Sequence, residues 1–294
     1  MKSWGRIVTA MVTPMDRTGG VDYAKAAELA RLFVAEGTTS LVVSGTTGES
    51  PTLNAQEKIK LFETVKKAVD VPVIAGVGTN STASSIESAR YAKESGVDGL
   101  LAVVPYYNKP NQESMYAHFA AIAEATSLPI MIYNVPGRTG VNLTADTSVR
   151  LSKIPNITAL KEASGDLVQL AKVVRDADES FAVYTGEDSQ ILPTLAVGGY
   201  GVVSVASQVA GAEIKNMIEC YLAGSVEEAA RWHQKLINIC EKLFMTSNPV
   251  PLKAALNLLG HEVGGTRLPL LSASPEVIQA LRKELIALGR LTEA

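Results

Sequence analysis

The chain has 294 residues, of which 47% are hydrophobic and 19% charged, and its formal net charge is −3. This composition is sufficient for a sizeable buried core in one large or two ordinary domains, and it argues against disorder. Because the basic residues are scattered along the chain, we expect neither nucleic acid nor an anionic membrane surface as a partner.

The cysteines, histidines and apolar runs narrow the class of protein further. Cys220 and Cys240 cannot form the disulfide framework of a small secreted domain, which favours a cytoplasmic protein. The first apolar stretch is interrupted by Pro14 and is short for a signal peptide, and no run approaches the ~20 residues of a membrane span. The three histidines lie far apart without neighbours at ligand spacing, so we expect no metal site.

Eight short apolar runs recur along the first three quarters of the chain, with amphipathic stretches of helical length between them. They begin at residues 6, 40, 72, 99, 129, 157, 181 and 201. Each interval leaves room for one helix, as a right-handed parallel crossover requires. Eight units predict a (β/α)₈ barrel, and about 225 residues is a normal size for one. An open doubly wound sheet is the alternative, although its usual six or fewer strands fit worse.

After residue 223 only helical signals remain, so we predict a catalytic barrel over 1–223 and a C-terminal helical appendage over 224–294. Ser225 and Glu228 predict a capping box at the start of the first helix of this appendage. Gly260 is expected to close a later helix, and Ser274 followed by proline to cap the last one.

Polar residues gather at the ends of the predicted strands, where the loops of a (β/α)₈ barrel carry its chemistry. Hydroxyl, phenol, ammonium, guanidinium and carboxylate groups occur there in five clusters: Thr46 to Glu49, Tyr106-Tyr107, Tyr133 to Arg138, Lys161-Glu162 and Gly186 to Asp188. This concentration predicts a catalytic or binding site at that end.

Lys161 is the sharpest of these signals. Strand alternation in "ITALKEA" (157–163) puts Ile157, Ala159 and Lys161 on one face, which directs the ammonium inward if the small residues face the barrel. The alternative is a lysine that reaches solvent from the strand end. A free lysine is neutral at pH 7 in only about one molecule in 2,500, and an apolar interior would raise that fraction by desolvation. The pattern is therefore compatible with a Schiff-base nucleophile.

Hydroxyl groups follow the neighbouring strands. Tyr133 is either a packing residue or a phenol that transfers protons to and from an amine nucleophile, and Thr46 and Tyr107 make a hydroxyl relay chemically feasible. The segment "GTTGES" (45–50) is either a glycine-rich turn or a cradle of N–H and hydroxyl groups for a carboxylate.

Five motifs in this order resemble one known family: "GTTGES", "PYYNKP", "YNVPGRTG", "LKEASGD" and "GEDSQ". They are similar to the dihydrodipicolinate synthase family of the pyruvate-dependent class I aldolases, a superfamily that includes N-acetylneuraminate lyase. The resemblance runs from about residue 5 to residue 290 without a large gap.

The resemblance implies roles for four catalytic residues. Lys161 matches the lysine that forms an imine with pyruvate, and Tyr133 matches the proton donor and acceptor. Thr46 and Tyr107 match the relay partners of that tyrosine, the second of which is lent by the neighbouring subunit of a tight dimer.

It also implies four substrate-binding residues. Thr47 matches the hydroxyl that holds the pyruvate carboxylate, and Val203 matches the position whose backbone lies beside pyruvate. Gly186 falls where the second-substrate site is lined. Arg138 matches the arginine that binds the carboxylate of aspartate semialdehyde, which sugar-acid lyases generally lack.

The implied protein is a cytoplasmic lyase of diaminopimelate and lysine biosynthesis. It would condense pyruvate with L-aspartate 4-semialdehyde to 4-hydroxy-tetrahydrodipicolinate, without a metal or organic cofactor, as a homotetramer built from two dimers. Two alternatives stay open: a sugar-acid aldolase of the N-acetylneuraminate lyase or 2-keto-3-deoxygluconate aldolase type, and a non-catalytic barrel that binds a keto acid.

Lysine-inhibited members of the family bind lysine at the dimer interface. This chain matches them at three positions, which the resemblance implies as a candidate allosteric site: Ser50, Asn80 and Tyr106. It departs from their histidines and glutamate with Ala55, Lys58 and Ser84. Because an ε-ammonium needs an anionic or strongly polar partner, we expect lysine to inhibit weakly or not at all.

Overall fold

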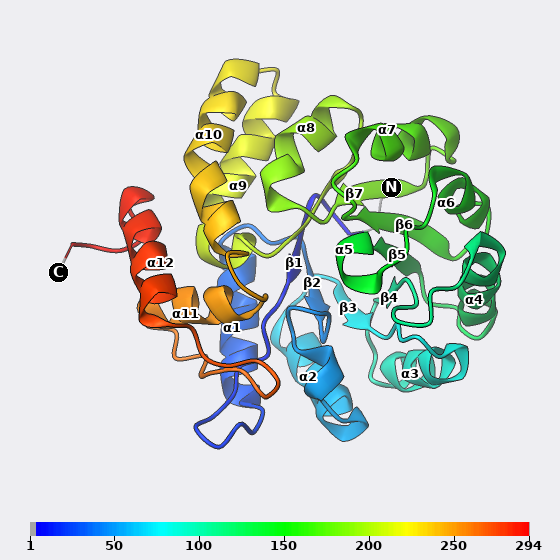
Figure 1. Ribbon diagram of the computed structural model, residues 1–294, viewed down its shortest axis with the longest axis horizontal. Helices are drawn as coiled ribbons and strands as arrows, with labels where there is room; N and C mark the ends of the chain where they lie inside the picture. The colour runs from blue at the N-terminus through cyan, green and yellow to red at the C-terminus, as the bar shows by residue number, and fades with distance from the viewer. Residues whose placement is uncertain (1–3, 294) are drawn as a thin grey trace.

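The computed structural model describes residues 4–293 and has a closed barrel of eight parallel strands at its centre (Figure 1). The strands are neighbours in sequence order, and β8 pairs back with β1. Their bounds are β1 Ile7–Ala10, β2 Ser40–Val43, β3 Val73–Gly76, β4 Gly99–Val103, β5 Ile130–Asn134, β6 Ile157–Glu162, β7 Ala182–Thr185 and β8 Gly201–Ser204. Each lies within one predicted apolar run, so the (β/α)₈ prediction is confirmed and the open sheet is excluded.

The strands were visible in the sequence because almost every strand residue is buried. A parallel strand that is covered on both faces appears as a continuous apolar run, with small residues where the barrel interior is crowded. Gly76 shows this crowding, since a Cβ atom there would lie 2.1 Å from the Ser44 carbonyl oxygen. Backbone approaches of this kind keep the end of β3 close to the loop that follows β2.

Helices surround the barrel as an outer ring. The main helices that follow the eight strands are α1 Tyr23–Ala35, α2 Ala55–Ala68, α3 Thr82–Glu94, α4 Gln112–Glu124, α6 Ala145–Leu151, α7 Leu167–Asp176, α8 Ile191–Ala196 and α9 Ser207–Leu222. Three short elements lie in the loops at the strand ends: η1 Ser50–Thr52, α5 Pro136–Thr139 and η2 Asp188–Gln190. The loops after β2, β5 and β7 are thus partly ordered by short helices of their own.

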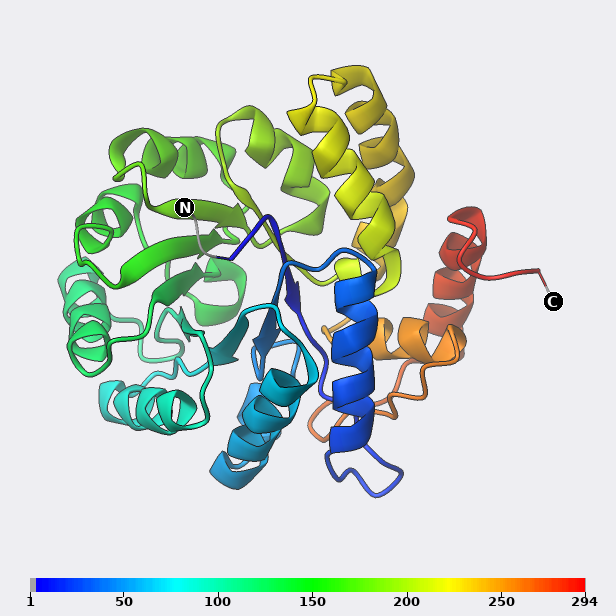
Figure 2. The ribbon, with the colours of Figure 1, turned by 180° about the vertical axis from the view of Figure 1, so that it is seen from behind.

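The C-terminal segment adds α10 Val226–Lys242, α11 Val250–Leu258 and α12 Pro275–Ala287. These helices lie on one side of the barrel, beside α1 and α9, in both Figure 1 and Figure 2. Buried residues of all three belong to the same apolar core as the strands. The division at residue 223 therefore separates two kinds of secondary structure but not two separate cores.

The predicted capping box at the start of α10 is wrong. Ser225 occupies the N-cap position, but its side chain accepts no cap hydrogen bond, and its ψ of 63° differs from the extended 170° of the capping Asn54. Glu228 pairs with Arg231 instead. The other two predictions in this segment are confirmed, because Ser274 accepts the N–H of the residue at N3 and Gly260 follows α11 at a φ of +84°.

Candidate active site

Strand pairing places Lys161 opposite Tyr133 at the C-terminal ends of β6 and β5. Lys161 is only 5% exposed, and its Nζ atom lies 4.1 Å from the centre of the Tyr133 ring. The lysine therefore points into the barrel and does not reach solvent, which decides between the two directions that the alternation left open.

Gly186 leaves the space that Lys161 occupies. A Cβ atom at this position would lie 2.8 Å from Cε of Lys161 and 2.7 Å from Cβ of Ala163. Contacts this short require a shift, so any larger residue at 186 would displace the lysine side chain. The sequence placed Gly186 in the site but gave no sign of this steric reason.

Burial controls the protonation of the two facing residues. Desolvation lowers the pKa of Lys161 to about 8, and the carboxylates of Asp188 and Glu187 oppose this shift. At that pKa roughly a tenth of the molecules carry a neutral amine at pH 7. Burial also raises the pKa of Tyr133 to about 12, so the phenol keeps its proton over the physiological range.

A cavity of about 470 Å³ opens over Lys161. Six of the eight predicted catalytic and substrate-binding residues line it: Thr46, Thr47, Tyr133, Arg138, Lys161 and Gly186. Thr46 and Tyr133 share its wall, but no hydrogen bond joins their side chains in the described part of the chain. A cavity of this size is typical of small-molecule sites, in which a few polar groups orient the ligand.

The other two predicted residues do not line this cavity. Val203 is fully buried within β8, and Val205, two residues later, is the one that reaches the cavity wall. Tyr107 is 88% exposed on the loop after β4 and has a φ of +74°. A single chain therefore leaves the Tyr107 phenol outside the site, and its relay role stays a prediction.

The C-terminal segment supplies cavity residues that the sequence did not reveal. Phe244, Thr246, Ser247 and Asn248 all lie in the wall. Asn248 is buried, and its Nδ2 donates a hydrogen bond of 2.9 Å to Oγ1 of Thr47. The sequence showed only a helix break in "SNPVP", and nothing local indicates a contact with a residue 201 positions earlier.

Two carboxyl groups after β7 complete the electrostatics of the site. Glu187 lies in the cavity wall. Asp188 is buried, and it accepts hydrogen bonds from the Ser204 hydroxyl and from the N–H groups of Val205 and Ala206. Burial raises the pKa of both carboxyl groups.

A second cavity of about 420 Å³ adjoins the first and shares Thr46, Tyr133 and Arg138 with it. Ser50 and Tyr106 line it, and so does Lys58, whose pKa is lowered by burial. Asn80 lies outside its wall, and its carbonyl accepts a hydrogen bond from Asn108.

Within residues 4–293, no three or more His, Cys, Asp or Glu side chains come together in a group that could hold a metal ion. Within the same residues, every helix is too short or too polar to cross a membrane.

Comparison with known proteins connects this geometry to one family. A model of the dihydrodipicolinate synthetase family matches residues 3–288. The 4-hydroxy-tetrahydrodipicolinate synthase of Moorella thermoacetica is 53% identical over 98% of this chain and 99% of its own length. Among solved structures, the dihydrodipicolinate synthase of Bacillus anthracis is 48% identical with a TM-score of 0.96, over 97% of this chain and 99% of that one. A lysine-bound dihydrodipicolinate synthase from Cyanidioschyzon merolae is 50% identical with a TM-score of 0.97, over 99% and 100% of the two chains.

The buried amine has a measurable effect on stability. Because the pKa of Lys161 is about 8 in the folded protein against an ordinary 10.5, protonated lysine destabilises the fold fully below pH 8. This cost disappears as the pH rises from 8 to 10.5. We expect Lys161→Met to raise the free energy of unfolding at pH 7 by about 3 kcal/mol. Urea unfolding at pH 7 and at pH 10 measures this difference in stability, which should be smaller at pH 10. An equal difference at both pH values would show that it comes from packing and not from the charge of Lys161.

Proposed function

We infer that the chain, which belongs to the dihydrodipicolinate synthetase family, is an enzyme that condenses pyruvate with L-aspartate 4-semialdehyde to 4-hydroxy-tetrahydrodipicolinate. The observation that carries the mechanism is the buried Lys161, whose lowered pKa and position against Tyr133 suit an amine nucleophile. This reaction belongs to the biosynthesis of diaminopimelate and lysine.

Imine formation needs a neutral amine and a positioned carboxylate. The neutral Nζ of Lys161 attacks the keto carbon of pyruvate, and the resulting carbinolamine loses water to give the imine. Thr47 is suited to hold the pyruvate carboxylate, because its Oγ1 already accepts a hydrogen bond from Asn248 and its hydroxyl proton is left to donate. Gly186 borders the bound substrates in this proposal, and Val205, two residues after the predicted Val203, takes the corresponding place just after β8.

Protons must move to and from the carbinolamine. With a pKa of about 12, Tyr133 acts as a neutral phenol. It gives its proton to the leaving hydroxyl and takes a proton back from the hydroxyl relay. Thr46 is the next group in the relay, since it lines the same cavity. Tyr107 of a neighbouring subunit completes it, which matches the exposure of this side chain in a single chain.

The carbon–carbon bond forms in the second half of the reaction. Loss of a proton from the methyl carbon of the imine gives an enamine, whose carbon attacks the aldehyde of aspartate semialdehyde. The amino group of that substrate then attacks the imine carbon, closes the ring and releases Lys161. The imine serves as the electron sink, so the proposal includes no metal and no organic cofactor.

Arg138 selects the second substrate. It lies in α5, at the boundary of the two cavities, where its guanidinium can hold a carboxylate through two parallel hydrogen bonds. A polyhydroxy aldehyde offers no such group, which argues against the sugar-acid aldolases. A non-catalytic keto-acid-binding barrel would have no use for a lysine with a lowered pKa.

The assembly and location belong to the same proposal. A second copy of the chain must lend Tyr107, so we propose a homo-oligomer, specifically a tetramer built from two dimers. We place it in the cytoplasm, in agreement with two free cysteines.

Borohydride trapping with pyruvate tests the nucleophile. We expect a mass increase that corresponds to reduced pyruvate and maps to Lys161. Lys161→Ala and Lys161→Arg should both abolish it, because a guanidinium stays protonated and cannot attack a ketone. Lys58→Ala removes another half-buried lysine beside the site and should retain the adduct. Normal trapping in Lys161→Arg would overturn the assignment.

Arg138→Ala tests the choice of substrate. Loss of a bidentate contact to a charged group costs about 1.5–3 kcal/mol, so kcat/KM for aspartate semialdehyde should fall roughly 10- to 150-fold. Imine formation with pyruvate should persist, as measured by trapping. If trapping were lost and the semialdehyde kinetics were unchanged, the arginine would have been assigned to the wrong substrate.

Lysine should inhibit weakly or not at all. The second cavity contains the cation of Lys58 beside Ser50 and Tyr106, and a second ammonium there would be repelled. We expect half-inhibition above roughly 1 mM, which is binding weaker than about −4 kcal/mol. The assay is the condensation rate against lysine concentration at near-saturating substrates. Lys58→Gln should become more sensitive, and strong inhibition of the unaltered enzyme would show that the retained residues suffice.

A further inference from the structure

A buried ion pair joins the turn after β2 to the C-terminal helix α11. Nζ of Lys253 lies 2.6 Å from Oε1 of Glu49, and both side chains are 2% exposed. Nζ of Lys253 also donates to the Gly265 carbonyl at 2.6 Å, and the N–H of Arg267 donates to Oε2 of Glu49 at 2.9 Å. The carboxylate of Glu49 is thus held from two parts of the C-terminal segment.

Glu49 ends the turn that carries the two active-site threonines. Its φ of +56° lies in the left-handed region, which is strained for a residue with a side chain and persists only where surrounding contacts enforce it. Its N–H bonds to the Thr46 carbonyl at 3.0 Å, and the next N–H, of Ser50, bonds to the Gly45 carbonyl at 3.2 Å. The position of Glu49 therefore fixes the path of the turn through Thr46 and Thr47.

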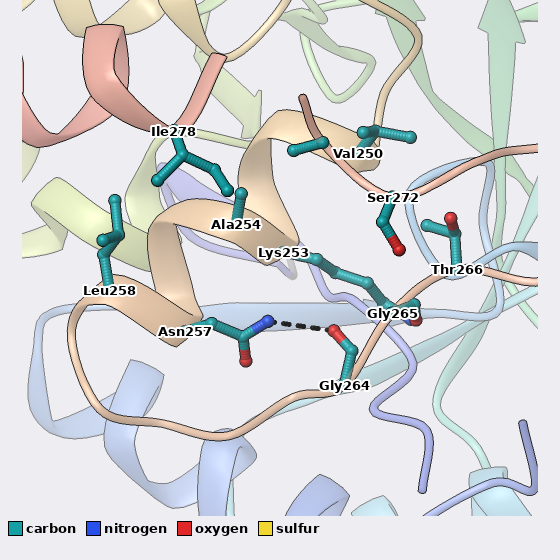
Figure 3. Close-up of a pocket in the computed structure, with 11 residues that line it drawn as sticks. Val250, Lys253, Ala254, Asn257, Leu258, Gly264, Gly265, Thr266, Ser272 and Ile278 are labelled. Carbon is teal, nitrogen blue, oxygen red and sulfur yellow. Dashed lines mark hydrogen bonds between the residues drawn. The ribbon is translucent and has the colours of Figure 1, made fainter. Parts of the chain in front are cut away.

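The same segment reaches the turn a second time, through the bond from Asn248 to Thr47. Figure 3 shows Lys253 extending from α11 toward the loop segment that carries Gly265, at the edge of a cavity of about 340 Å³. Two residues later in this segment, Arg267 also binds the barrel: it donates hydrogen bonds to the carbonyl groups of Gly19 and Thr52 and forms an ion pair with Glu57.

We propose that Lys253 is a positioning residue of the reaction: through Glu49 it holds Thr46 and Thr47 at the positions where the pyruvate carboxylate and the proton relay need them. This rests on the proposed function, since the roles of the two threonines belong to it. Lys253 itself does not line the cavity over Lys161.

Two features support a positioning role over a purely stabilising one. A buried ion pair contributes little stability beyond what well-packed apolar residues would give, because desolvation offsets the attraction. Its effect is geometric, since the Glu49 carboxylate meets the Lys253 ammonium and the Arg267 N–H group only in one place. The pair is also located at the strained residue of the turn and not at an ordinary position of a helix or strand.

The test compares Lys253→Met, the double variant Glu49→Gln/Lys253→Met, and Arg290→Met as the matched control. Arg290 also connects the C-terminal segment to the barrel, through ion pairs with Glu36 and Glu213. Glu36, however, lies at the end of α1 just before β2, which is the end of the barrel opposite the active site. Three quantities are measured: the melting temperature, kcat/KM for pyruvate, and hydrogen exchange of the peptide that covers residues 45–53.

We expect kcat/KM for pyruvate to fall at least tenfold in Lys253→Met, with faster exchange in the 45–53 peptide. The double variant leaves no lone buried charge, so it should regain thermal stability while both defects persist. Arg290→Met should lower the melting temperature without either defect. If Lys253→Met does not fold, the double variant decides.

Normal kcat/KM and exchange in the folded double variant would overturn the proposal, and so would equal losses in Arg290→Met at a matched melting temperature. Failure of the proposed function is separately visible, because unaltered protein would then form no borohydride-trapped adduct at Lys161. Exchange of the 45–53 peptide would still show whether Lys253 holds the turn.

Discussion

The burial of one amine inside a closed barrel is the constraint on which the site depends. Burial removes the Lys161 ammonium from water, and this desolvation lowers its pKa to about 8. The space for this side chain exists only because position 186 is a glycine. The same burial keeps the Tyr133 phenol protonated, so one physical effect prepares both the nucleophile and its proton donor.

Strand register converts this constraint into geometry. Tyr133 pairs with Lys161, and the next residues, Asn134 and Glu162, pair on the outer face of the barrel. There the buried Glu162 carboxylate accepts hydrogen bonds from the Asn134 and Gln169 amides and from a backbone N–H. A slip by one residue would exchange the faces. The acid would then enter the cavity and the lysine would meet amide groups that cannot neutralise it.

The sequence predicted what depends on local pattern. Eight buried strands appear as apolar runs, and alternation around Lys161 limits its side chain to two directions, of which the structure selects the inward one. Prediction from the sequence failed where a hydrogen bond or an ion pair depends on backbone angles or on a partner far away in the chain. Ser225 has the right residue type for a cap but the wrong ψ. Asn248 and Lys253 meet the turn after β2 across about two hundred positions of sequence. No periodicity records such a contact, because only the closed fold brings the two segments together.

The acidic groups near Lys161 explain why its pKa is lowered only to about 8. Glu187 and Asp188 favour the ammonium, whereas a buried lysine without such neighbours titrates at about 5–6. Before the reaction, these two carboxyl groups reduce the fraction of Lys161 that is a neutral amine. Once the imine has formed, its protonated nitrogen carries a positive charge in the same place, and the same groups stabilise that charge. The amine and the iminium need opposite environments, and a site that buries the lysine but places carboxyl groups beside it serves both.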